Sequence, residues 1–139
     1  MSGDSSPSGD GGTTVGTPGV APVFETEHAV SVGDARALAV PDESVDLVVT
    51  SPPYPMVEQW DDLFAALDPT VGDALAVADS GDGAGNAAER AFDAMHEALA
   101  PAWREVARAL APGGVACVNV GDATRSAGDR LRLWDNTTR

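Results

Sequence analysis

The sequence feature that most constrains the fold is an apolar segment followed directly by a proline-rich segment. Residues 45–50 read Val-Asp-Leu-Val-Val-Thr, so Leu47, Val48 and Val49 are consecutive and apolar. Such a run predicts a strand that is covered on both faces. The next segment, Ser51-Pro52-Pro53-Tyr54-Pro55, cannot continue that strand, because proline lacks the N–H that a strand ladder needs. We therefore expect a buried strand to end here and a stiff segment to follow its carboxyl end.

Two stretches after the prolines have helical periodicity. Apolar residues at helical spacing predict a helix over residues 56–67. A longer stripe recurs at steps of three and four, at Phe92, Met95, Leu99, Trp103, Val106 and Leu110. Because the stripe keeps its phase across Pro101, it predicts one kinked helix rather than two. The breakers Ala111-Pro112-Gly113-Gly114 end it.

The other segments complete an α/β pattern. Residues 115–120 predict a second strand, closed by Gly121-Asp122, and the alternation in residues 29–32 predicts a short first one. Residues 68–86 are rich in Asp, Gly and Ala and predict a surface loop, whereas residues 1–22 have the composition of a disordered tail. The resulting order of elements predicts a three-layer α/β sheet. On this pattern Trp60, Trp103 and Cys117 are core residues.

The chain is strongly acidic. It has 22 acidic residues against 8 basic ones, all of them Arg, and a net charge of −14. In dilute salt such a chain repels nucleic acid. In about 1 M salt the Debye length falls to about 3 Å, so surface acids barely repel a phosphate backbone. Together with the absence of Lys, the charge favours adaptation to a salt-rich cytoplasm; a merely acidic mesophilic protein is the alternative.

Several classes of protein are disfavoured. A single cysteine, Cys117, excludes an internal disulfide framework and a cysteine-based zinc site. His28 and His96 have no partners at metal-ligand spacing, so we expect no metal. There is no apolar run of about 18 residues and no basic-then-apolar leader, so we expect a cytoplasmic protein without a membrane segment.

The segment after residue 50 offers the chemistry of amine recognition. In α/β sheets, ligands bind beyond the carboxyl ends of the strands. The Ser51 hydroxyl and the neighbouring main-chain carbonyls are stiff acceptors beside the ring of Tyr54. Two acceptors that hold the N–H bonds of an exocyclic amino group would aim its lone pair at an electrophile, while the aromatic ring stacks on the heterocycle. A plain proline-rich turn is the alternative interpretation.

These residues resemble a known family. Ser51-Pro52-Pro53-Tyr54 after an Asp-Leu-Val-Val strand resembles the catalytic motif of the DNA amino-methyltransferases, which transfer a methyl group from S-adenosylmethionine to cytosine N4 or adenine N6. Gly33-Asp34-Ala35 is similar to the family's turn before that strand, and residues 95–122 are similar to its downstream helix, turn and strand. The resemblance covers about residues 28–139 and is greatest to an archaeal-type subgroup.

The resemblance implies a Rossmann-like three-layer fold, of which residues 23–139 are the N-terminal part, and a target base flipped out of the duplex. It implies that Ser51, Pro52 and Tyr54 are catalytic with Pro53 as their structural companion, and that Asp34 and Thr50 contact the cofactor S-adenosylmethionine. A structural role for Asp34, in a turn or as a helix cap, is the alternative to a cofactor contact. Serine at the first motif position favours cytosine N4 over adenine N6.

The family's Phe-x-Gly-x-Gly cofactor loop has no counterpart in this sequence, since the Gly-rich residues 81–85 do not follow a predicted strand. We therefore expect a second chain or a further C-terminal part to carry that loop and the target-recognition region. DNA is the implied partner, in a restriction–modification setting. The alternatives are a non-catalytic remnant and a methyltransferase acting on adenine N6, RNA or protein.

Two minor features stay open in the sequence. Asp122 could line the pocket, cap a segment or be exposed to solvent. A basic cluster could form a phosphate-contacting edge or a solvated tail; its members are Arg125, Arg130, Arg132 and Arg139.

Overall fold

The computed structural model describes residues 25–80 and 83–138, which fall into two units, residues 1–31 and 32–139. In the first unit the described residues form neither helix nor strand, and Thr26 Oγ1 lies 2.8 Å from His28 Nε2. The short strand predicted over residues 29–32 is therefore wrong: no strand pairs with it in the described chain, and Val30 and Val32 are fully exposed. The predicted tail, residues 1–22, lies outside the described residues.

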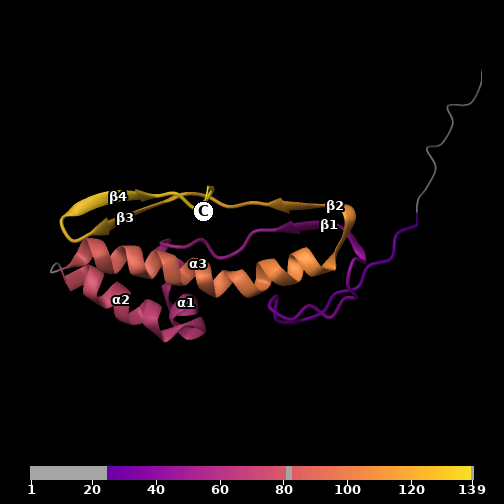
Figure 1. Ribbon diagram of the computed structural model, residues 1–139, viewed down its shortest axis with the longest axis horizontal. Helices are drawn as coiled ribbons and strands as arrows, with labels where there is room; N and C mark the ends of the chain where they lie inside the picture. Colours follow the sequence, from indigo (N-terminus) through magenta and orange to yellow (C-terminus); the bar gives the residue numbers. More distant parts are fainter. Residues whose placement is uncertain (1–24, 81–82, 139) are drawn as a thin grey trace, which may run out of the picture. The chain divides into compact units, whose positions relative to one another are not determined.

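The second unit is built on a parallel strand pair. Strand β1 (Val45–Thr50) pairs with β2 (Leu110–Val118), so that Thr50 lies opposite Val118. Parallel neighbours require a long crossover, which here is helical. It consists of the short 3-10 helix η1 (Glu58–Trp60), α1 (Asp61–Leu67), α2 (Pro69–Ser80) and α3 (Ala84–Ala109) (Figure 1). The two predicted strands and the α/β class are confirmed.

Two glycines lie near the start of β2, Gly113 and Gly114. Gly113 has a φ of +87°, in the left-handed region that favours glycine. At Gly114, a Cβ atom would lie 2.9 Å from the Ala111 carbonyl oxygen and 3.0 Å from that of Val45. Only glycine lets the two backbones approach this closely, at the point where the register of the β1–β2 pair shifts between the pairs Val45–Leu110 and Leu47–Val115.

Helix α3 runs without a break through Pro101, which confirms one helix rather than two, whereas Leu110, the last residue of the predicted stripe, begins β2. The helix predicted over residues 56–67 begins later, because Met56 has a φ of +66° and η1 precedes α1. The loop predicted over residues 68–86 is wrong, since α2 occupies most of it. Asp68 caps α2 by accepting a 2.9 Å hydrogen bond from the Thr70 N–H, and Pro69 takes the first helical position. Small alanines hid the helical period of this segment.

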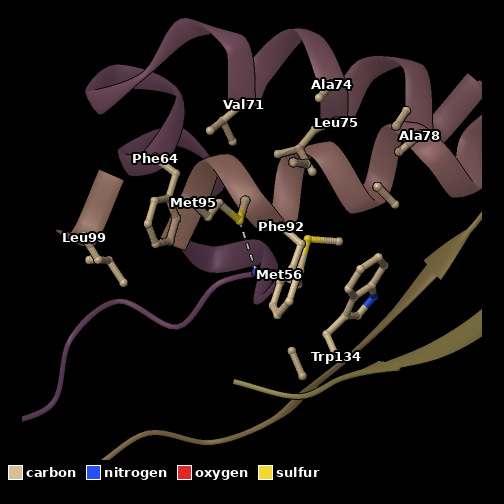
Figure 2. Packing of buried hydrophobic residues seen from close by; sticks show 14 residues of the cluster. Met56, Phe64, Val71, Ala74, Leu75, Ala78, Phe92, Met95, Leu99 and Trp134 are labelled. Atoms are coloured by element: carbon tan, nitrogen blue, oxygen red, sulfur yellow. Dashed lines mark hydrogen bonds between the residues drawn. The ribbon is translucent and has the colours of Figure 1, made fainter. Parts of the chain in front are cut away.

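The core lies where the helices meet the end of the chain. Figure 2 shows Phe64, Met95 and Phe92 packed together beneath Val71 and Leu75, with Met56 and Trp134 closing the cluster. The predicted core positions Trp60 and Trp103 are partly buried against it. Cys117 is instead exposed, which corrects its assignment to the core.

An antiparallel hairpin follows β2 and was not predicted. Strands β3 (Ala123–Ala127) and β4 (Arg130–Trp134) pair, and the Trp134 ring centroid lies 5.2 Å from that of Phe92 on α3. Arg125 on β3 is buried, and its guanidinium lies 2.8 Å from both carboxylate oxygens of Asp61. It is therefore part of the packed fold rather than of a solvated tail. Arg130 is exposed, Arg132 pairs with Glu89 at 2.8 Å, and Arg139 lies outside the described residues.

The β1–β2 pair has one open face. Leu47, Val49 and Val115 are 56%, 74% and 54% exposed. In the described residues the sheet has two strands, and α3 lies beside β2 and β3 (Figure 1). The prediction that β1 is covered on both faces is therefore not met, because the described residues leave the face of Leu47 and Val49 open. The described residues also do not form a three-layer arrangement. No described helix is long and apolar enough to cross a membrane.

Candidate active site beyond strand β1

The predicted catalytic segment lies at the carboxyl ends of both parallel strands. Ser51 Oγ and the Tyr54 hydroxyl are 2.8 Å apart. Asn119, which follows β2, donates from Nδ2 to the Tyr54 hydroxyl at 3.2 Å, and its backbone N–H donates to the Thr50 carbonyl at 2.8 Å. The structure thus brings Ser51 and Tyr54 together and adds Asn119. Sequence reasoning missed Asn119, although its place after a strand next to β1 was a usable signal.

The proline segment is held in a strained turn. The Val57 N–H donates to the Tyr54 carbonyl at 3.2 Å, with Pro55 and Met56 as the central residues. Proline followed by a positive φ, here +66° at Met56, is the pattern of a type II turn, in which glycine is usual at the third position. Such a residue costs about 1–3 kcal/mol and persists only where packing fixes it. Met56 is buried, and its N–H lies 3.2 Å from the Met95 sulfur, so the turn is fixed from within the core.

A buried amide lies behind this turn. Asn136, which follows β4 by two residues, donates from Nδ2 to the carbonyls of Pro55, at 3.1 Å, and Gly121, at 3.0 Å. Its Oδ1 lies 3.2 Å from His96 Nε2. Its backbone N–H donates to Asp122 Oδ1 at 2.9 Å, so Asp122, which is exposed, caps this backbone N–H. Asn136 was not predicted, because the hairpin that delivers it was not.

Two cavities adjoin the segment. One of about 430 Å³ is lined by Pro52, Pro53 and Pro55 together with His96, Trp103 and Asn136. The other, of about 520 Å³, is lined by Asp34 and Arg36 and by the apolar side chains of Leu67 and Leu99. Pro53 and Leu99 line both cavities, so the two share a wall. The structure thus brings Asp34 and Pro53 to one cavity, whereas Thr50 lines neither.

Asp34 is an exposed turn residue with a charged partner. Arg36 donates to the Asp34 carboxylate from Nε and from a terminal nitrogen, the latter at 2.7 Å, and also from its backbone N–H at 2.8 Å. Hydrogen bonds from the Arg36 side chain, with help from its backbone, lower the pKa of Asp34 to about 2. Asp34 is therefore a carboxylate at neutral pH. Among the residues that the structure describes, no group of three His, Cys, Asp or Glu side chains could hold a metal ion.

Comparisons with known proteins agree on one family. Residues 45–137 match the model of the N6/N4-type DNA methylases. The chain is 43% identical over 115 residues to the type II methyltransferase M.MjaI of Methanocaldococcus jannaschii, covering 80% of this chain and 38% of that protein. It is 49% identical over 98 residues to the type II methyltransferase M.MthZI of Methanothermobacter thermautotrophicus, covering 70% of this chain and 26% of that one.

No solved structure matches the chain significantly. The chain spans less than two-fifths of the length of either relative. The family match nevertheless includes both strands, the helices between them and the hairpin, and it contains the whole segment from Ser51 to Tyr54. The chain therefore belongs to the DNA methylase family of amino-methyltransferases.

Proposed function

We propose that this chain carries the catalytic motif of an S-adenosylmethionine-dependent DNA methyltransferase that modifies the exocyclic amino group of a flipped cytosine, at N4. The observation that carries the proposal is the cluster of Ser51, Tyr54 and Asn119 beyond two parallel strands, in a member of this family. The choice of N4 over adenine N6 rests on serine at the first motif position.

The residues of this chain act by orienting the amine. When bound, S-adenosylmethionine would supply an electrophilic methyl group and leave as S-adenosylhomocysteine, and the methylated amine would lose one proton to solvent. The amine of a nucleobase is a poor nucleophile, because its lone pair is delocalised into the ring. Ser51 Oγ and the Pro52 carbonyl oxygen accept hydrogen bonds from the two N–H groups of this amine. These hydrogen bonds turn the nitrogen lone pair out of conjugation with the ring. If Ser51 donates its own proton to the Tyr54 oxygen, 2.8 Å away, both Ser51 lone pairs stay available to the amine.

The cavity beside Asp34 suits the cofactor. Its volume of about 520 Å³ lies within the range of small-molecule sites, and it combines an apolar wall with one carboxylate. The Asp34 carboxylate would attract the positive charge of S-adenosylmethionine. A contact from Thr50, at the end of β1, rests on the family resemblance alone, because Thr50 does not line this cavity. The present partner of Asp34, Arg36, forms an exposed ion pair, which water and salt screen, so the cofactor could take the place of Arg36 at little cost.

A further polypeptide would complete the enzyme. The sequence contains no Phe-x-Gly-x-Gly loop, and the open sheet face of Leu47, Val49 and Val115 is apolar enough to pack against more protein. We propose that a C-terminal part or a second chain carries the cofactor loop and the target-recognition region and covers this face. The competing candidate is a non-catalytic remnant, which the same open face also favours.

The charge of −14 is compatible with a DNA substrate if the protein works in a salt-rich cytoplasm. Screening over about 3 Å then removes most of the repulsion between surface acids and phosphates. We also propose that the protein acts in a restriction–modification system, as the similarity to two type II methyltransferases suggests.

Methyl transfer to DNA tests the proposal. The chain is assayed in molar salt, alone and with the remaining 62% of the M.MjaI polypeptide, outside the matched 38%, added in trans, using labelled S-adenosylmethionine. We expect N4-methylcytosine in the digested DNA, and its loss in Ser51→Ala and Tyr54→Ala. Ser126→Ala, an exposed serine on β3, is the matched control. Methyladenine as product would overturn the choice of base, and an active Tyr54→Ala variant would refute the site. Absence of cofactor binding under both conditions would favour the remnant.

A further inference from the structure

We propose that Asn136 is a positioning residue, which fixes the catalytic segment and Asn119 relative to each other through one buried amide. Its consequence for methyl transfer rests on the function proposed above. Asn136 is 7% exposed, and it lies on the cavity side of the segment, beside Pro55. It is brought there by the β3–β4 hairpin, whose last residue, Trp134, is anchored in the core beside Phe92 (Figure 2).

The hydrogen bonds fix the orientation of this amide. The carbonyls of Pro55 and Gly121 can only accept, so the amide atom that faces both of them is the nitrogen. The amide oxygen then faces His96 Nε2, which must carry a proton to donate. All three polar positions of the buried amide are used, so no isosteric side chain can replace it without leaving a buried group unpaired.

The two carbonyls belong to the two halves of the site. Pro55 directly follows Tyr54, whereas Gly121 lies two residues beyond Asn119. The nitrogen of Asn136 therefore ties the loop that carries Ser51 and Tyr54 to the segment that donates to the Tyr54 hydroxyl. A shift of either segment lengthens one of these bonds, so the amide holds the hydroxyl cluster in register.

The segment that presents Asn136 is itself ordered. Asp135 accepts hydrogen bonds from the backbone N–H groups of Thr137 and Thr138, at 3.0 and 3.1 Å, and from both threonine hydroxyls. These bonds form a local turn that limits the freedom of the backbone around Asn136. The side chain is thus presented from a structured turn.

Tyr54 provides a direct readout, because it is the only tyrosine in the chain. With ¹³C-labelled tyrosine, ring NMR signals report on one residue in the catalytic segment. In Asn136→Asp the shape is kept, but a carboxylate faces the Pro55 and Gly121 carbonyls, so we expect the Tyr54 ring signals to shift and broaden. Asn86→Asp makes the same change at an exposed position on α3 and should leave them unchanged. His96→Ala keeps both carbonyl bonds and should move the Tyr54 signals much less.

The catalytic consequence is measured separately. In the complemented enzyme, Asn136→Asp should lower kcat by about 10²-fold, the cost of a misplaced reacting group, with little change in the KM for S-adenosylmethionine. If Asn136→Asp fails to fold, Asn136→Ser, which keeps one donor, should fold and show a smaller Tyr54 shift of the same direction. Unshifted Tyr54 signals in a folded Asn136 variant would overturn the proposal. Shifted signals without any methyl transfer by the parent protein would instead overturn the proposed function alone.

Discussion

The ion pair between Arg125 and Asp61 provides a quantitative test of the packing. The Arg125 guanidinium is 7% exposed and Asp61 is 25% exposed, and a second acid, Asp79, lies 3.9 Å away. Burial lowers the pKa of Arg125, but the hydrogen bonds and charge of Asp61 raise it by more, so the side chain stays charged. The pair joins β3 to the first turn of α1 and so holds the hairpin that carries Asn136.

The two ends of this pair should have unequal effects. Removing one partner of a buried pair costs about 3–5 kcal/mol, because a buried charge is left uncompensated. Asp61→Leu leaves the buried guanidinium without its main partner, and the exposure of Asp61 reduces the expected loss to about 2–4 kcal/mol. Arg125→Met leaves a carboxylate that water already reaches, so we expect a loss of about 1–2 kcal/mol. The double variant should be more stable than Asp61→Leu, because two apolar groups replace the pair.

The measurement is denaturant unfolding in molar salt, followed by tryptophan fluorescence, for the parent chain, both single variants and the double variant. A coupling free energy of at least about 1 kcal/mol is expected from the cycle. Additive single effects, or an Arg125→Met variant less stable than Asp61→Leu, would refute the reasoning.

Three further predictions concern local features. Gly114→Ala should lower the free energy of unfolding by about 1–3 kcal/mol, because the new methyl group is overpacked against two carbonyl oxygens. Gly85→Ala, at an open position on α3, should raise the free energy of unfolding by about 0.5–1 kcal/mol. Equal effects of the two variants in thermal melts would contradict the close approach at Gly114. Hydrogen bonds from Thr138 and Thr137 lower the pKa of Asp135 from 3.8 to about 2. Because the folded-state pKa is the lower one, the stabilisation by Asp135 should be complete above about pH 5 and lost as the pH falls toward 2; a carboxyl ¹³C titration with a midpoint near 4 would disprove this. Finally, a net charge of −14 predicts that the unfolding midpoint rises with KCl up to molar concentrations, and a fold equally stable without salt would sink the halophilic interpretation.

The sequence predicted the elements that have strong periodicity or strong breakers. The stripe from Phe92 to Leu110 was enough to predict a helix that continues through Pro101, and the prolines after Thr50 marked the end of β1. Helix α2 was not predicted, because two of its four buried residues are alanines, which give only a weak apolar periodicity in a segment with a loop-like composition. Strand β1 was expected to be covered on both faces because its residues are apolar, but exposure is decided by what packs against it.

The site was predictable only as far as it is local. Ser51 and Tyr54 are three residues apart, so their meeting follows from the stiffness of the segment between them. Asn119 and Asn136 reach the segment over long sequence separations, through strand pairing and through a hairpin whose alternation the sequence showed only weakly. Nothing in one sequence indicates which of several asparagines ends beneath a proline turn. The assignments of Asp34 and Thr50 to the cofactor and of Ser51 to cytosine N4 remain proposals.

The most direct test is the nucleoside composition of DNA treated with this chain, its complementing polypeptide and S-adenosylmethionine. The account predicts N4-methylcytosine with the parent chain and none with Ser51→Ala or Tyr54→Ala, while Ser126→Ala retains full activity. Methylated DNA from the Tyr54→Ala variant, or no methylated base with the complemented parent chain, would contradict it.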